Sequence, residues 1–267
     1  MDDLEKRLAK AVCYFWKTRA LQGETQGGSK GDKDRGTRGT VTGGRHCDGF
    51  AHLIKELLVE SGVSDALVFH KRNKIELDAE PIERKTPREL SEVKKGTELP
   101  GYFRPTKDWD LVAVADGHLI ASVEFKSQVG SFGNNFNNRT EEALGNATDL
   151  WTAYREGAFE QSQKPWLGYF MLLEDAQGST SPVSVREPHF PVFKAFKGAS
   201  YEKRYELLCQ RLVRERLYNA ACFILSDRQR GPYGRYREPN VEIGFRSFAA
   251  SLMGHAMAFA KLRKGHR

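Results

Sequence analysis

Residues 110–126 form the most constraining pattern in this sequence: two apolar runs joined by an Asp-Gly pair, with acids at the outer ends. An Asp-Gly pair between apolar runs is a strong signal for a β-hairpin. A two-residue loop would put Asp110 and Glu124 on opposite faces of the hairpin, whereas a three-residue loop, residues 115–117, would put them on the same face. Gly117 supplies the left-handed conformation that the last position of such a loop requires. We therefore predict the three-residue loop.

This register gives the hairpin one polar and one apolar face. Glu124 and Lys126 share a face because side chains alternate along a strand. Asp110 and Ser122 join them in the predicted register. The other face is apolar throughout and suited to packing under a helix. It consists of Leu111, Ala113, Ala115, Leu119, Ala121, Val123 and Phe125.

The polar face is a candidate catalytic site. Asp110 and Glu124 supply hard oxygen ligands that suit Mg²⁺, and the backbone carbonyl of Phe125 is a candidate third ligand. Lys126 can orient an attacking water, lower its pKa or stabilise charge in the transition state. The pattern thus predicts magnesium-dependent hydrolysis of a phosphodiester. The alternative is a half-buried hairpin with solvated charges at its open end.

A polar run follows the second strand directly. Asparagine pairs with adenine, and arginine with guanine, through two hydrogen bonds in the major groove of DNA. A loop that leaves the candidate site is well placed to reach bases beside the cleaved bond, although a polar turn has the same composition. The candidate DNA-binding residues here are Asn134, Asn135, Asn137, Asn138 and Arg139.

The net charge of +7 is concentrated in one segment. Residues 203–237 hold nine Lys or Arg and three Asp or Glu, a balance of +6, and such clusters attract phosphate. Residues 203–216 are typical of a solvated helix face. Residues 227–239 contain Gly and Pro, which prevent a regular helix, so we predict a basic loop that grips phosphates or enters a groove. Its candidate residues are Arg228, Arg230, Arg235 and Arg237.

Composition is typical of a globular cytoplasmic protein. Hydrophobic residues make up 39% and charged residues 29% of the 267 positions, and no apolar run approaches membrane-spanning length. The first residues contain no apolar signal region. The four cysteines are widely spaced and form no Cys-x-x-Cys pair, which favours a reducing compartment and disfavours structural zinc. We expect no membrane association.

The sequence resembles the XhoI-type type II restriction endonucleases, a branch of the PD-(D/E)xK nuclease superfamily. The resemblance extends over roughly residues 10–250. It departs from the superfamily pattern at one point, where Trp109 precedes Asp110 in place of proline. The matching stretches are the Asp-x13-Glu-Phe-Lys pattern and residues 41–50, 130–139 and 141–157.

The resemblance implies an α/β fold with an αβββαβ core, in which helices flank a central mixed sheet. We expect one restriction-endonuclease domain, residues 1–267, with a Gly/Lys/Arg-rich loop at 22–45. It also implies that Glu56, on the helix before the sheet, points at the metal; the alternative is a surface glutamate. Residues 71–108 are expected to be irregular, apart from a short helix at 87–94. Further helices are expected at 4–21, 47–61, 140–157, 201–220 and 248–262, and strands at 66–70, 167–173 and 221–226.

By the same resemblance, the substrate would be double-stranded DNA at the palindrome CTCGAG, cut after the first C to leave 5′ overhangs. A palindromic target implies a two-fold symmetric reader, so we expect a homodimer. A modification methyltransferase is expected as a genetic partner and not as a stable complex. Two alternatives stay open: a nuclease of the same fold that acts on damaged or branched DNA, and a non-catalytic DNA-binding regulator.

Overall fold

The computed structural model describes residues 2–24, 45–64, 67–70, 96–115, 117–159 and 163–264. Most of the predicted 22–45 loop and the predicted helix at 87–94 lie outside these residues, as does Asp116 of the hairpin turn. Within them, no helix has both the length and the apolar character that crossing a bilayer needs.

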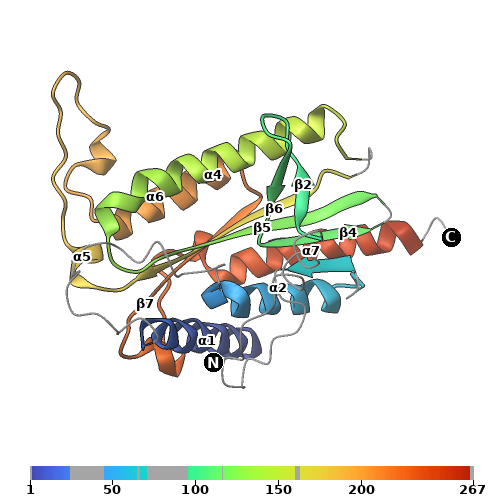
Figure 1. Ribbon diagram of the computed structural model, residues 1–267, viewed down its shortest axis with the longest axis horizontal. Helices are drawn as coiled ribbons and strands as arrows, with labels where there is room; N and C mark the ends of the chain where they lie inside the picture. The colour runs from blue at the N-terminus through green and yellow to red at the C-terminus, as the bar shows by residue number, and fades with distance from the viewer. Residues whose placement is uncertain are drawn as a thin grey trace.

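A five-stranded mixed sheet forms the centre of the fold (Figure 1). The first three strands in sheet order pair antiparallel, and the last two join them in parallel. These last two strands are buried along their whole length, which explains why they read as continuous apolar runs in the sequence. In sheet order the strands are β1 (Val68–His70), β4 (Leu111–Ala115), β5 (His118–Gln128), β6 (Trp166–Glu174) and β7 (Ala220–Ser226).

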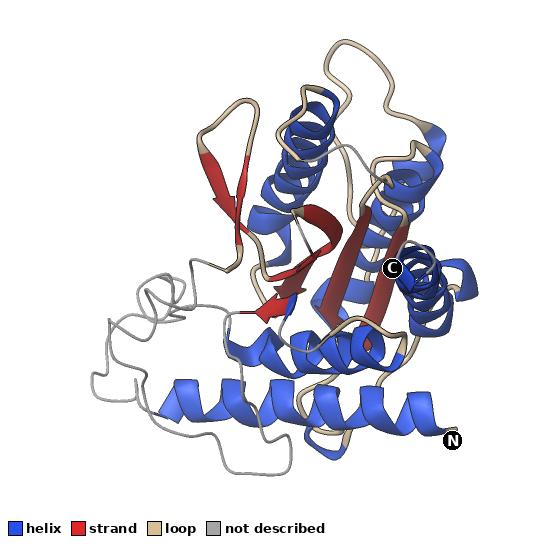
Figure 2. Cartoon of the chain, turned by 90° about the vertical axis from the view of Figure 1, so that its right-hand side faces the viewer, coloured by secondary structure: helices blue, strands red, loops and turns tan. Residues whose placement is uncertain are grey.

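Helices cover both faces of this sheet (Figure 1, Figure 2). On one face, α1 (Asp3–Glu24), α2 (Asp48–Glu60) and α7 (Phe245–Lys264) share one buried apolar cluster with the strands. On the other face, α4 (Phe132–Arg155) and α6 (Tyr201–Arg214) share a second buried apolar cluster with the strands. Short helical segments connect the larger elements: α5 (Gln177–Thr180) and the 3₁₀ turns Arg45–Cys47, Lys194–Phe196, Gly231–Tyr233 and Val241–Ile243.

The element order confirms the predicted arrangement of a central mixed sheet flanked by helices. In chain order α2, β1, β4, β5, α4 and β6 follow one another as αβββαβ, with one hairpin inserted after β1. The expected strands at 167–173 and 221–226 are confirmed as β6 and β7. The expected helix at 201–220 ends early, at Arg214, and the chain turns at Arg216, whose φ is 58°.

Two predictions of local structure were wrong. Residues 96–108 are not irregular, because β2 (Glu98–Pro100) and β3 (Thr106–Asp108) form an antiparallel hairpin of their own. Helix α4 begins at Phe132 and not at residue 140, so residues 132–139 are helical and not a loop. Four asparagines weigh against a helix in intrinsic propensity, but Phe132 and Phe136 pack on the α6 side and anchor this part of the helix.

The predicted three-residue hairpin loop was also wrong. Ala115 pairs with His118, which leaves a two-residue loop. The pairing then shifts by one position, since Ala113 pairs with Ala121 and Ile120 is left as the extra residue of a β-bulge. The predicted apolar face was therefore wrong at one position. Leu119 lies in the apolar cluster under α4, and Ile120 lies in its place in the cluster under α2.

Candidate active site

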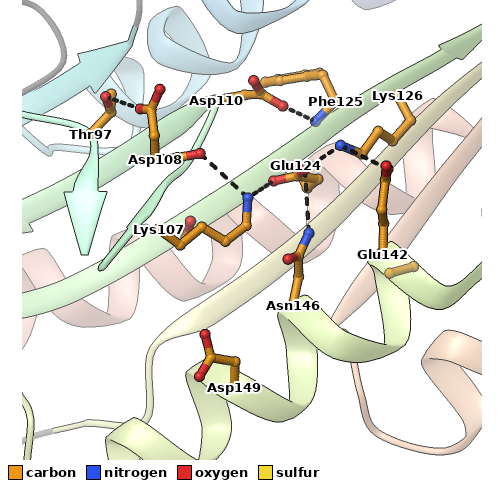
Figure 3. A network of polar contacts seen from close by, with 12 residues as sticks. Thr97, Lys107, Asp108, Asp110, Glu124, Phe125, Lys126, Glu142, Asn146 and Asp149 are labelled. Atoms are coloured by element: carbon orange, nitrogen blue, oxygen red, sulfur yellow. Dashed lines mark hydrogen bonds and ion pairs between the residues drawn. The ribbon is translucent and has the colours of Figure 1, made fainter. Parts of the chain in front are cut away.

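The bulge brings the two predicted carboxylates onto the same face. Beyond it Leu111 pairs with Val123, and the register continued by one residue places Asp110 opposite Glu124. Asp110 Oδ2 accepts a hydrogen bond of 2.8 Å from the backbone N–H of Phe125 (Figure 3). The expected proximity of Asp110 and Glu124 is therefore present, although the loop that was expected to produce it is not.

Glu124 lies at the centre of a buried polar cluster. Its side chain is 3% exposed, with Oε1 2.5 Å from Lys126 Nζ and Oε2 2.9 Å from Lys107 Nζ. The side-chain amide of Asn146 donates to Oε1 at 3.4 Å. Burial alone would raise the pKa of Glu124, but the charges of Lys126 and Lys107 outweigh it and hold the pKa below its usual range. Glu124 is thus an ionised, oriented acceptor at neutral pH.

Lys126 bridges two carboxylates. Its ammonium lies 2.5 Å from Glu124 and 3.3 Å from Glu142 on α4 (Figure 3). Burial would lower the pKa of Lys126, yet Glu124 and Asp110 raise it above the usual lysine value. Glu142 is held in turn by Arg139 at 2.8 Å. Because its raised pKa keeps Lys126 protonated, it can donate to a water or a phosphoryl oxygen but is not set up to act as a base.

Sequence reasoning missed three members of this cluster. Glu142 and Asn146 lie on consecutive turns of α4, and Lys107 comes from β3. Lys107 precedes Asp110 by three residues, so its closeness in sequence was the one available signal. Because residues 71–108 were predicted to be irregular, Lys107 was not expected to lie beside Glu124.

The donor set fits a hard divalent cation such as Mg²⁺. Asp110 and Glu124 offer carboxylate oxygens on one face, which is the ligand chemistry that magnesium prefers. The N–H and C=O of one strand residue point to the same edge, so the Phe125 carbonyl is on the same side as the N–H that bonds Asp110. Among the described residues, no three His, Cys, Asp or Glu side chains gather as a metal site.

Glu56 is not brought to this cluster. Its carboxylate contacts Arg7 of α1 at 2.8 Å and His52 at 3.1 Å. These contacts join α1 and α2 at the surface, which agrees with the alternative of a surface glutamate.

The five candidate DNA-binding residues after β5 occupy the first two turns of α4. Asn134, Asn137 and Asn138 are exposed. Asn135 is partly buried, and its side chain donates to the Ser131 carbonyl at 3.1 Å. Arg139 is paired with Glu142 as described above. The three exposed asparagines therefore project from a helix N-terminus, whose partial positive charge favours an anionic partner.

The predicted basic loop at 227–239 contains arginines in two kinds of environment. Arg230 and Arg235 are exposed; the Arg230 side chain is 79% exposed and lies 3.7 Å from the Asp227 carboxylate. Arg228 is paired with Glu174 at the end of β6. Arg237 contacts Asp175 at 2.6 Å and Glu202 at 2.6 Å, so its guanidinium fastens the loop to the body of the protein.

Fold and cluster together define an α/β protein with an acid-and-lysine site on its central sheet, a type of site that metal-dependent hydrolases use. The chain belongs to the restriction endonuclease XhoI family, whose model matches residues 26–80 and 86–238. It is therefore a type II restriction endonuclease, a hydrolase that acts on double-stranded DNA. Enzymes of this class generally use a divalent metal ion.

Individual relatives are also type II restriction enzymes. The chain is 47% identical over 236 residues to the type II restriction enzyme BstVI of Geobacillus stearothermophilus, covering 86% of this chain and 95% of the relative. It is 42% identical to XhoI of Xanthomonas vasicola, over 78% of this chain and 75% of that one. AbrI of Azospirillum brasilense is also 42% identical, over 70% and 74%. No solved structure matches the chain.

Proposed function

We propose that this restriction endonuclease hydrolyses DNA with Mg²⁺ held by Asp110, Glu124 and the carbonyl of Phe125. The observation that carries the proposal is the convergence of two carboxylates and one lysine on one face of the β4–β5 hairpin. We also propose that the sheet and its helices form the PD-(D/E)xK fold in one domain, as the element order supports.

The roles of the residues follow from their surroundings. When bound, Mg²⁺ polarises a phosphoryl oxygen and lowers the pKa of a water. Lys126, protonated between Glu124 and Glu142, orients the attacking water and stabilises charge that develops on the phosphate. Asn146 fixes the Glu124 side chain from the α4 side.

The proposed target is the palindrome CTCGAG, cut after the first C to leave 5′ overhangs, by a homodimer with one site for each strand. Support comes from membership in the XhoI family. The exposed asparagines Asn134, Asn137 and Asn138 are proposed to contact bases, and Arg228, Arg230 and Arg235 to contact phosphates. A cognate methyltransferase is proposed as a genetic partner.

The test combines plasmid cleavage with duplex binding. Glu124→Gln, which keeps the shape of the side chain, is expected to reduce the cleavage rate by at least about 10³-fold while duplex affinity changes little. Glu56→Gln is the matched control and is expected to cut at the wild-type rate. Mapping the fragment ends tests the target and the cut position. Cleavage by Glu124→Gln at the wild-type rate would show that the site has been assigned to the wrong residues.

A further inference from the structure

Lys107 lies outside the β4–β5 hairpin, yet its ammonium contacts the Glu124 carboxylate. Lys107 Nζ is 2.9 Å from Glu124 Oε2, and the side chain is 12% exposed (Figure 3). The ammonium also lies 4.5 Å from the ring centre of Trp109 and donates to the Asp108 carbonyl at 3.3 Å. Its position is therefore fixed by three separate contacts.

The β2–β3 hairpin that carries Lys107 is itself firmly attached. At its base, Thr97 donates to the Asp108 carboxylate at 2.7 Å. At its tip, Asp149 of α4 accepts hydrogen bonds of 2.8 Å from the backbone N–H groups of Tyr102 and Phe103. The β2–β3 hairpin thus holds Lys107 against Glu124 from the segment directly before β4.

This position conflicts with a cation on Glu124. Magnesium binds carboxylate oxygens at about 2.0–2.1 Å, so a cation on Oε2 would lie within a few ångströms of the Lys107 ammonium. Like charges at that separation repel strongly in a buried site. Lys126 differs because Glu142 offers it a second carboxylate at 3.3 Å. A cation coordinated to Oε2 would therefore compete with Lys107 for that oxygen.

We propose that Lys107 is a positioning residue that occupies the cation's place on Glu124 and must be displaced when the cation binds. The proposal rests on the proposed function, because it requires Glu124 to be a metal ligand. Lys107 orients the carboxylate, and it sets the concentration of cation at which the site fills. Its flexible four-carbon stem allows the ammonium to move aside without a change in the hairpin.

The test is Mg²⁺ binding to the DNA-free protein, measured by calorimetry. Lys107→Met removes the charge and keeps an apolar stem over Trp109, so it is expected to bind Mg²⁺ at least about tenfold more tightly than the wild type. Lys107→Arg retains the charge and is expected to bind within about twofold of the wild type. A residue that only braces the hairpin would not raise cation affinity when it is removed.

Lys164→Met is the matched control. Lys164 Nζ also lies over a tryptophan, 4.3 Å from the Trp151 ring centre, so the variant removes the same charge from the same kind of contact elsewhere on the protein. It is expected to bind Mg²⁺ as the wild type does. If thermal unfolding shows that Lys107→Met is not folded, Lys107→Gln is measured in its place and the same result is expected.

Glu124→Gln separates this inference from the proposed function. Loss of Mg²⁺ binding in Glu124→Gln, together with unchanged or weaker binding in the Lys107 variant, would overturn the role of Lys107 and leave the metal site standing. Wild-type binding in Glu124→Gln would instead overturn the proposed metal site, and the role of Lys107 with it.

Discussion

At the scale of single residues, Asp149 shows how one buried carboxylate can hold an entire hairpin. It accepts the N–H groups of Tyr102 and Phe103 and lies 2.7 Å from Arg104 Nε. Burial would raise the pKa of Asp149, but the bonds from Phe103, Arg104 and Tyr102 lower it below the usual range. The ionised form is therefore the one that the folded protein stabilises.

Asp149→Asn is expected to lower the free energy of unfolding by about 3 kcal/mol at neutral pH, because three hydrogen bonds lose their charged acceptor. The lowered pKa means that the wild type holds this stability above the pKa of the unfolded carboxyl and loses it as pH falls through the folded-state pKa. The difference between the two proteins in urea unfolding should therefore shrink in acid. Glu141→Gln, an exposed neighbour on α4, is the control and should change stability by less than about 0.5 kcal/mol. A difference that stays constant down to pH 2 would contradict this account.

The structure brings Asp110, Glu124 and Lys126 together as the sequence predicted, while their catalytic roles stay predictions. Alternation along one strand is enough to place Glu124 and Lys126 on one face, whereas Asp110 joins them through the bulge in the hairpin. Prediction from the sequence failed for Lys107, Glu142 and Asn146. Those residues reach Glu124 through the packing of a separate hairpin and a helix, and no local pattern encodes that packing.

At the scale of elements, the β4–β5 hairpin shows how a correct conclusion can follow from a wrong register. Turn chemistry alone allowed two loop lengths, and no local pattern indicated the bulge at Ile120. The bulge restores the shared face of Asp110 and Glu124 despite the two-residue loop. Buried strands and amphipathic helices were predictable because their patterns are long. The start of α4 was not, because aromatic packing by Phe132 and Phe136 outweighs the low helix propensity of the asparagines.

The N-terminal turns of α4 are expected to read bases. Asn138→Ala removes an exposed side chain and should weaken binding to a cognate duplex by about 1–3 kcal/mol, with little change in affinity for an unrelated duplex. Asn135→Ala is the control, since Asn135 is bonded to the Ser131 carbonyl. Both affinities are measured by competition binding at a fixed salt concentration. Equal losses on cognate and unrelated DNA would mean that Asn138 contacts phosphate and does not read a base.

At the scale of the whole molecule, the proposed palindromic target predicts two copies of this chain on one duplex. Sedimentation of the complex with non-cleavable cognate DNA should give two 30.2 kDa chains for each duplex. Cleavage by mixed dimers supplies an independent measurement. A wild-type chain paired with a Glu124→Gln chain retains one intact site, so it should nick one strand of a supercoiled plasmid and accumulate open circles, whereas the wild-type dimer yields linear DNA. Full double-strand cleavage by a preparation that contains only mixed dimers would mean that one chain cuts both strands, and a single chain on each duplex would exclude the dimer.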